Sequence, residues 1–283
     1  MHRPVTGVTA GAAALAVFFC ARRLRRYLVT ALLMAAAVSP AAGQTTVFSD
    51  GFNRAALDVG TPATSTATVT TGDGGASGVS SSFLQLTNDA AAAAVASGRV
   101  CVSAPTTSYT GGYNSTLSAD SGPIEWTVNL RYNPSPRAGG FNAGKPGLAV
   151  VLGATAADLT AGSGYAIAIG HTGKSDRAQL FKFTDGLTAD NNLTAVVAAP
   201  TGNLAGITDY ASVRVRYDPA TNQWSLFVRD DGAIAWADPS SGVTNLVGTA
   251  TDSAYTTVNM SSFGYFWNYG SSGTQSARTT TSR

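Results

Sequence analysis

The sequence predicts an all-β protein, an antiparallel β-sandwich of two packed sheets that is preceded by a signal peptide. The first observation is composition. The chain has 283 residues, of which 31 are glycine and 12% are charged, with glutamate once (Glu125) and lysine three times. A helical protein covers its surface with Glu, Lys and Leu, whereas Thr, Ser, Gly and Asn are typical of strands and turns. The second observation is an alternation of apolar and polar residues with period two, which is typical of strands with one buried face.

The first 43 residues are predicted to be a leader. Arginines stand at positions 22, 23, 25 and 26, an apolar run spans 27–38, and small residues fill 39–43. This order is typical of a secretory signal peptide. We therefore expect a mature chain, 44–283, that is secreted to the outside of the cell or to its surface. A second apolar run, 8–20, precedes the arginines, so either the true start lies near Leu24 or the basic region is long. Both runs are shorter than the ~20 residues of a membrane span, and no stable membrane anchor is expected once the leader is removed.

Removal of the leader changes the charge of the chain. The leader contains five arginines and no acidic residue, so the mature chain has thirteen basic and sixteen acidic residues, a formal charge of −3 instead of +2. We therefore expect no nucleic-acid partner. Cys20 lies in the leader, which leaves Cys101 without a partner for an internal disulfide. Because Cys101 stands between two valines, we expect it in a buried strand.

Three segments show the alternation most clearly: 124–132, 213–217 and 224–228. The last two are joined by Asp218-Pro219-Ala220-Thr221-Asn222, whose Pro, Asp and Asn favour a hairpin loop. The segment 61–82 is rich in Thr, Ser and Gly and is expected to be a long surface loop. Further strands are expected at 83–87, 148–152, 165–169, 179–184 and 262–269.

The sequence lacks the residue sets that common catalytic sites need. Glycoside hydrolysis usually requires two carboxylates across a cleft, but the strand of Glu125 contains no second acidic residue. A Ser-His-Asp site requires an oriented histidine, and His171, the only histidine after the leader, lies in a turn-like Gly170-His171-Thr172-Gly173 segment. We therefore expect no enzyme activity and no cofactor. Calcium is the open alternative, because Asp and Asn oxygens suffice to bind it; Asp50 and Asn53, or Asp230 and Asp231, could contribute, although no spaced calcium-loop pattern is present.

The candidate ligand-binding residues lie on the polar side of the alternating strands and in one loop. If the strands are neighbours, their polar sides form one arginine-lined sheet face; the alternative is an ordinary solvated face. Trp236, near Pro239, is expected to be an exposed aromatic residue in a loop. A second set of aromatic residues, 263, 265, 267 and 269, is expected in the core, with a stacking platform for sugar rings as the alternative. The candidate binding residues are Asn129, Arg131, Arg214, Arg216 and Trp236.

Three segments together resemble a known family. Phe48-Ser49-Asp50-Gly51-Phe52-Asn53-Arg54 resembles the opening strand of concanavalin A-like, laminin G-like jelly-roll modules of secreted bacterial proteins. Residues 210–219, followed by Asn222 and Trp224, resemble the central hairpin of these modules, and 263–269 resemble a late strand. The resemblance covers roughly 46–270. It implies a jelly roll of two antiparallel sheets and, often, binding to carbohydrate or to a cell surface, with no fixed ligand residues to transfer.

The C-terminus departs from this family. Its modules usually close with a strand that contains an aromatic or apolar residue, then Asp-Asn, then a β-branched residue, but this chain ends Ser-Ala-Arg-Thr-Thr-Thr-Ser-Arg. If the codons are read from the third base of the Arg278 codon, they permit Tyr-Asp-Asn-Val. Our hypothesis is that a frameshift replaced the closing strand and removed any domains downstream.

These observations favour a secreted, non-catalytic β-sandwich module that binds a glycan or a cell-surface polymer. Because this function depends on analogy between folds, two alternatives stay open. One is a structural or adhesive accessory module without a small ligand, and the other is a degenerate glycoside hydrolase.

Overall fold

A computed structural model gives the structure of the protein. The described residues belong to one compact unit, Thr46–Arg283. The predicted leader, 1–43, and two candidate calcium ligands, Asp50 and Asn53, lie outside the described residues. No helix within these residues is long and apolar enough to cross a lipid bilayer. The structure describes residues 46–48, 58–59, 65–66, 68–71, 76–80, 83–87, 98–109, 111–133, 139–171, 177–199, 202–206, 208–270 and 276–281.

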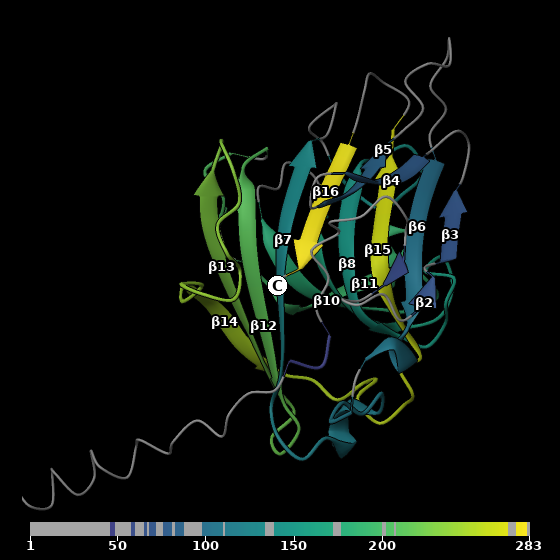
Figure 1. Ribbon diagram of the computed structural model, residues 1–283, viewed down its shortest axis with the longest axis vertical. Helices are drawn as coiled ribbons and strands as arrows, with labels where there is room; N and C mark the ends of the chain where they lie inside the picture. The colour runs from purple at the N-terminus through teal and green to yellow at the C-terminus, as the bar shows by residue number, and fades with distance from the viewer. Residues whose placement is uncertain are drawn as a thin grey trace, which may run out of the picture. The chain divides into compact units, whose positions relative to one another are not determined.

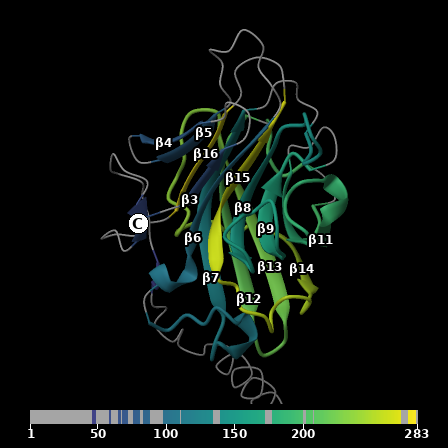
Figure 2. The same ribbon diagram turned by 90° about the vertical axis from the view of Figure 1, so that its right-hand side faces the viewer.

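The described chain forms two seven-stranded antiparallel sheets, which confirms the predicted two-sheet sandwich (Figures 1 and 2). A pair of short strands, β1 (Asp58–Val59) and β2 (Ser65–Thr66), stands apart from them, and three short 3-10 turns lie at Thr106–Ser108, Leu117–Ala119 and Asp190–Asn192. Sheet I has the order β11 (Leu193–Val197), β10 (Ala178–Phe183), β9 (Gly164–Ile169), β8 (Gly147–Ala154), β15 (Ser262–Tyr269), β6 (Gly98–Pro105), β3 (Thr68–Thr71). Sheet II has the order β14 (Leu246–Thr251), β13 (Gln223–Gly232), β12 (Tyr210–Asp218), β7 (Ile124–Asn133), β16 (Ser276–Thr281), β5 (Phe83–Thr87), β4 (Ala76–Ser80).

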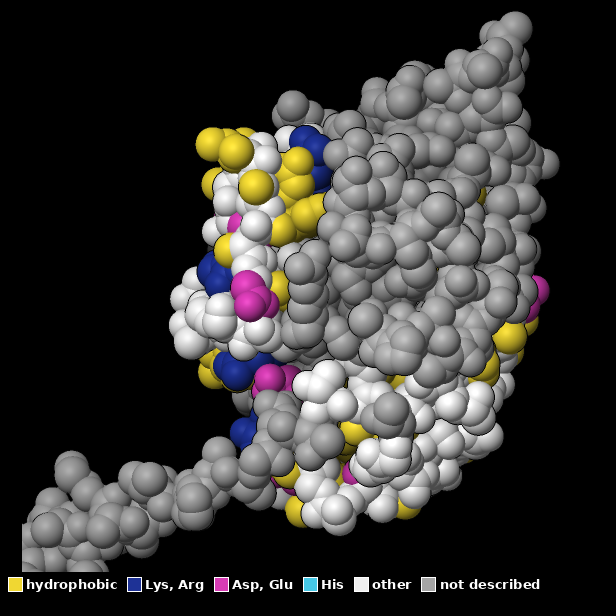
Figure 3. Space-filling model, viewed as in Figure 1, with side chains coloured by type: hydrophobic (Ala, Val, Ile, Leu, Met, Phe, Trp, Pro, Cys, Tyr) yellow, Lys and Arg dark blue, Asp and Glu magenta, His cyan; other side chains and the backbone are white. Residues whose placement is uncertain are grey.

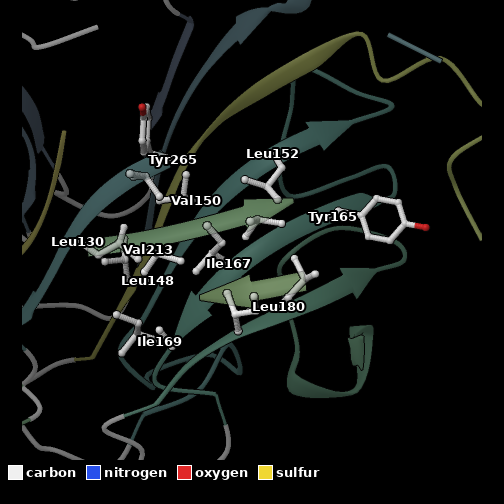
Figure 4. Packing of buried hydrophobic residues seen from close by; sticks show 14 of the residues in the cluster. Leu130, Leu148, Val150, Leu152, Tyr165, Ile167, Ile169, Leu180, Val213 and Tyr265 are labelled. Atoms are coloured by element: carbon white, nitrogen blue, oxygen red, sulfur yellow. The ribbon is translucent and has the colours of Figure 1, made fainter. Parts of the chain in front are cut away.

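The main core lies between the two sheets. The apolar residues of the predicted alternation face inward from sheet II, among them Val213 on β12 and Leu226 on β13. Sheet I contributes Leu148 and Ile167 to the same cluster (Figure 4). The aromatic residues of β15 also belong to the core, with Trp267 at 0% exposure. This burial corrects the alternative that they form a platform for sugar rings, because their faces are covered by protein.

From β8 to β10, and at β15, sheet I is buried on its outer face as well. Phe181 and Phe266 on this face form a second cluster with side chains from the loops that cover it, including Phe141. Asn268 holds one of these loops, because its side-chain nitrogen donates to the carbonyl oxygens of residues 142 (2.8 Å) and 145 (2.6 Å). Cys101 lies in the same cluster at 1% exposure, as predicted, and burial raises the pKa of its thiol to about 12.

One expectation about the chain is corrected. The segment 61–82 was expected to be a loop, yet it contains β2, β3 and β4. These strands are rich in Thr, Ser and Gly, and β3 and β4 form by pairing with β6 and β5 rather than by an apolar pattern of their own. At the other end of the chain, Ser276–Thr281 form β16, which pairs with both β7 and β5; the frameshift stays a hypothesis that the nucleotide sequence would test.

Candidate functional site

The candidate binding residues on strands share the outer face of sheet II. Arg131 is the cross-strand neighbour of Tyr210, and Asn129 is the neighbour of Ser212. Two and four residues further along β12, Arg214 and Arg216 occupy the same face, because side chains alternate with period two. Figure 3 shows dark blue basic side chains along this side of the molecule, beside yellow apolar and magenta acidic ones. The predicted arginine-lined face is therefore present as a single surface.

Asn129 belongs to a buried polar network on this face. The Ser212 hydroxyl lies 2.8 Å from Asn129 Oδ1 and 2.5 Å from Asp231 Oδ2, and it accepts an N–H from Arg229 Nη2 at 2.8 Å. Arg229 Nε also donates to Asp231 Oδ1 at 2.6 Å. Asn129 is 4% exposed and the Asp231 side chain is 2% exposed. Asn129 thus lies beneath the surface and links strands, rather than presenting its amide to solvent.

This network holds the loop 233–245 against the sheet. Asn129 Nδ2 donates to the carbonyl of Ala237 at 3.2 Å, and the backbone N–H of Ala237 donates to Asp231 Oδ2 at 3.0 Å. Arg229 donates to the carbonyls of Asp238 (3.1 Å) and Ser241 (2.6 Å). The hydroxyl and backbone N–H of Ser240 lower the pKa of Asp238 from its ordinary value. The loop is therefore fixed by hydrogen bonds to β7 and β13.

Trp236 is held by the same loop. Its Nε1 donates to the backbone oxygen of Leu130 on β7 at 3.1 Å, and the side chain is half-buried, where an exposed aromatic residue was predicted. Its ring meets the Tyr210 ring edge to face, with centroids 4.9 Å apart and an interplanar angle of 89°. Near the start of the loop, Ile234 is 91% exposed.

Arg131 completes this group. Its guanidinium carbon lies 4.5 Å from the centroid of the Tyr210 ring, a cation–π contact, and its Nε donates to the carbonyl of Thr208 at 3.2 Å. We call Arg131, Tyr210 and Trp236 the Arg131 platform. It joins two fixed aromatic rings to a guanidinium at the surface of sheet II. The structure gives the two terminal nitrogens of Arg131 no protein partner among the described residues.

The other half of the face carries a second guanidinium group. Arg214 lies with its guanidinium carbon 4.1 Å from the Phe227 ring centroid, and its Nη1 is 3.6 Å from Glu125 Oε2. The Arg214 Nε atom is buried and has no hydrogen-bond partner. Arg216 is exposed and is the cross-strand neighbour of Glu125. The carboxylate of Glu125 is thus paired with a cation.

The remaining candidates for chemistry lie elsewhere. The Asp230 carboxylate accepts the backbone N–H groups of Ala205 at 2.5 Å and Gly232 at 2.7 Å, and Asp231 belongs to the network above. Within the described ranges, no three His, Cys, Asp or Glu side chains come together as a metal-binding group. His171, which follows the end of β9 in the segment with a turn-like sequence, is half-buried on the covered side of sheet I, with its ring centroid 4.5 Å from that of Phe181.

Sequence reasoning missed several residues of the site. Tyr210, Ser212 and Arg229 were not among the candidates, and Asp231 was considered only as a calcium ligand, although Ser212 and Arg229 lie on the polar side of strands whose alternation is clear. The alternation of apolar and polar residues was sufficient to place both of them on the outer face of sheet II. The contact between Trp236 and Tyr210 carried no signal, because a loop residue and a strand residue meet there through tertiary folding.

Known proteins resemble this chain in fold but not in sequence. No family model matches the sequence, and no curated protein matches it. Among solved structures, lectin II from Ulex europaeus is 13% identical over 76% of this chain and 93% of its own, with a TM-score of 0.43. The Ca²⁺/Man2-bound exoplasmic/lumenal domain of VIP36 is 12% identical over 83% and 86%, with a TM-score of 0.43. A legume lectin-like domain from Entamoeba histolytica is 14% identical over 75% and 87%, with a TM-score of 0.41. The neighbours are legume-lectin-like β-sandwiches; at such low identity no ligand residue can be transferred.

Proposed function

We propose that this chain is a secreted, non-catalytic module that binds carbohydrate on the outer face of sheet II, at the Arg131 platform. The observation that carries the proposal is the fixed arrangement of Trp236, Tyr210 and Arg131. Aromatic rings offer a flat apolar surface with a polar rim, which suits the apolar face of a sugar ring. The guanidinium adds planar hydrogen-bond donors beside it.

Preorganisation supports this assignment. Because Trp236 Nε1 is bonded to the Leu130 carbonyl, the orientation of its ring is set before a ligand arrives. The Arg131 Nε–Thr208 bond does the same for the guanidinium. A ligand therefore loses little affinity to the ordering of these side chains, a cost of roughly 0.5–1.5 kcal/mol for each long side chain that is immobilised on binding.

The surroundings of Glu125 support the non-catalytic part of the proposal. Retaining and inverting glycosidases place two carboxyl groups on either side of the scissile bond. Glu125 instead has Arg214 Nη1 at 3.6 Å from its carboxylate, so the charged neighbour that the structure records for it is a cation and not a second carboxylate. Release of reducing sugars from a β-glucan by the pure protein would contradict this part of the proposal.

A glycan array probed with the purified protein tests the function. We expect binding to a subset of glycans, and Trp236→Ala and Tyr210→Leu should each weaken it about tenfold or more, as loss of a stacking partner requires. Tyr255→Leu is the matched control, because Tyr255 is a half-buried aromatic residue that packs against Tyr165 instead. Thermal unfolding of each variant verifies that it is folded. Silence across the array would overturn the proposal in favour of a structural or adhesive module.

A further inference from the structure

We infer that the ligand is an anionic polysaccharide whose sugars carry carboxylate groups, held by the arginines of the outer face of sheet II. The inference rests on the proposed function and names the class of ligand for the same face. It starts from an uneven distribution of charge. From residue 44 onward the sequence has ten arginines and a formal charge of −3. Of the arginines whose side chains the structure describes, four nonetheless lie on this one sheet face: Arg131, Arg214, Arg216 and Arg229.

The acidic side chains on this face neutralise only part of that charge. Arg229 is paired with Asp231 at 2.6 Å and Arg214 with Glu125 at 3.6 Å. Arg131, by contrast, contacts a carbonyl oxygen and an aromatic ring, both of which are neutral. At the rim, Asp230 and Asp238 accept backbone N–H groups of the neighbouring loops. The guanidinium of Arg131 and that of Arg216, which is exposed and whose cross-strand neighbour Glu125 is paired with Arg214, are therefore the groups that can receive an external anion.

The spacing and the shape of the donors define the ligand further. Arg131 lies opposite Tyr210 of β12, and Arg216 lies six residues further along that strand. This separation is about 20 Å in an extended strand. A ligand that reaches both is longer than a single sugar ring, so it is a polymer. The planar guanidinium fork matches a carboxylate with two parallel hydrogen bonds, and the rings of the Arg131 platform provide the adjoining stacking surface. Carboxylate-bearing sugars combine both features.

Polygalacturonate and its fully methyl-esterified form test the inference, because they share one backbone and differ in charge. With a chelator present to exclude calcium bridging, we expect the purified protein to bind immobilised polygalacturonate at least about tenfold more tightly than the ester, since a charged hydrogen bond is lost at each ester. Sodium chloride should weaken this binding steeply, because the Debye length falls from about 10 Å at 0.1 M to about 3 Å at 1 M.

Three variants localise the effect. Arg131→Gln and Arg216→Gln should each weaken binding to polygalacturonate about tenfold; Arg216 is exposed, so its variant is expected to fold normally. Lys145→Gln is the matched control, since it removes the same charge from an exposed position in the loop over sheet I. Its affinity should equal that of the unmodified protein.

Each other outcome is decisive. Equal binding of the acid and the ester would overturn the inference while leaving carbohydrate binding intact, as would binding to neutral glycans alone. Binding to dextran sulfate but not to polygalacturonate would overturn the choice of carboxylate. A loss with Lys145→Gln as large as that with Arg216→Gln would show attraction by overall charge and would also overturn it. Absence of binding to every glycan, charged or neutral, would remove the proposed function itself.

Discussion

Asp231 lies beneath the loop that carries Trp236, and its replacement by alanine tests how that loop is held. The carboxylate accepts from Arg229 Nε at 2.6 Å and from the backbone N–H of Ala237 at 3.0 Å, and it lies 2.5 Å from the Ser212 hydroxyl. Asp231→Ala removes all three contacts at once. It also leaves the guanidinium of Arg229 without its counter-ion.

The expected loss in the free energy of unfolding depends on how deeply the two charged side chains are buried. Removing one partner of a buried ion pair costs about 3–5 kcal/mol, whereas an exposed pair contributes at most about 1 kcal/mol. The Asp231 side chain is 2% exposed, but that of Arg229 is 21% exposed, so water screens the remaining cation in part. We therefore expect the free energy of unfolding to fall by about 2–3 kcal/mol. In a domain of this size 1 kcal/mol shifts Tm by about 2–4 °C, so Tm should fall by roughly 4–12 °C.

Differential scanning calorimetry and urea denaturation measure this loss. Asp238→Ala is the control, because Asp238 is an exposed acidic residue of the same loop, and it should cost less than about 1 kcal/mol. The double variant Arg229→Met, Asp231→Ala should recover part of the stability, because it leaves no unpaired buried charge. A loss below about 1 kcal/mol for Asp231→Ala would refute the reasoning.

Three further predictions concern the core and the end of the sandwich. Trp224→Ala should lower the free energy of unfolding by about 3–5 kcal/mol, because Trp224 is fully buried and its ring centroid lies 4.4 Å from that of Tyr165; an unchanged urea midpoint would contradict this packing. Cys101 should not react with a thiol reagent at pH 8 until the protein unfolds, since burial raises its pKa to about 12, and rapid labelling of the native protein would contradict it. Burial by itself would raise the pKa of Asp252, but hydrogen bonds from Lys182 and Tyr165 outweigh it and hold the pKa below its ordinary value. The folded protein therefore gains stability from this carboxylate above about pH 4, the pKa of an unfolded Asp, and loses it as the pH falls further. The advantage in Tm over Asp252→Asn should accordingly be present at pH 7 and fade below pH 4, and an advantage that persists at pH 2 would contradict the assignment.

The strands that could be predicted are those with bulky apolar residues at every second position. In β7, β12 and β13 the alternation specifies both the strand and its buried face, and the core confirms it. In β3 and β4 the side chains are Thr, Ser, Val, Ala and Gly, whose pattern alone does not separate a strand from a loop. β3 forms by pairing with β6, which is distant in the sequence, and such pairing leaves no local signal. β4 pairs with the next strand, β5, but its small side chains give no alternation that would reveal it.

The candidate site was predictable as a face but not as a set of contacts. Alternation places Arg131, Arg214 and Arg216 opposite the core, and the structure brings them onto one surface. The half-burial of Trp236 was not predictable, because it depends on a hydrogen bond to Leu130, which is 106 residues away in the sequence. The burial of Asn129 has the same kind of cause, a bond to Ala237 across 108 residues.

The two sheets differ in what their outer faces can do, and the loops explain the difference. The described strands of sheet I from β8 to β10 are buried on both faces, so sheet I provides a close-packed layer against which sheet II rests. On sheet II the loop 233–245 is bonded to the sheet through Asp231 and presents the Trp236 ring beside Tyr210. A ligand on this face thus meets rings that were ordered by buried polar contacts before it arrived, and it bears no cost for ordering the loop. It follows that Asp231→Ala should lower the affinity for a glycan by about as much as Trp236→Ala, although Asp231 itself is buried beneath the loop.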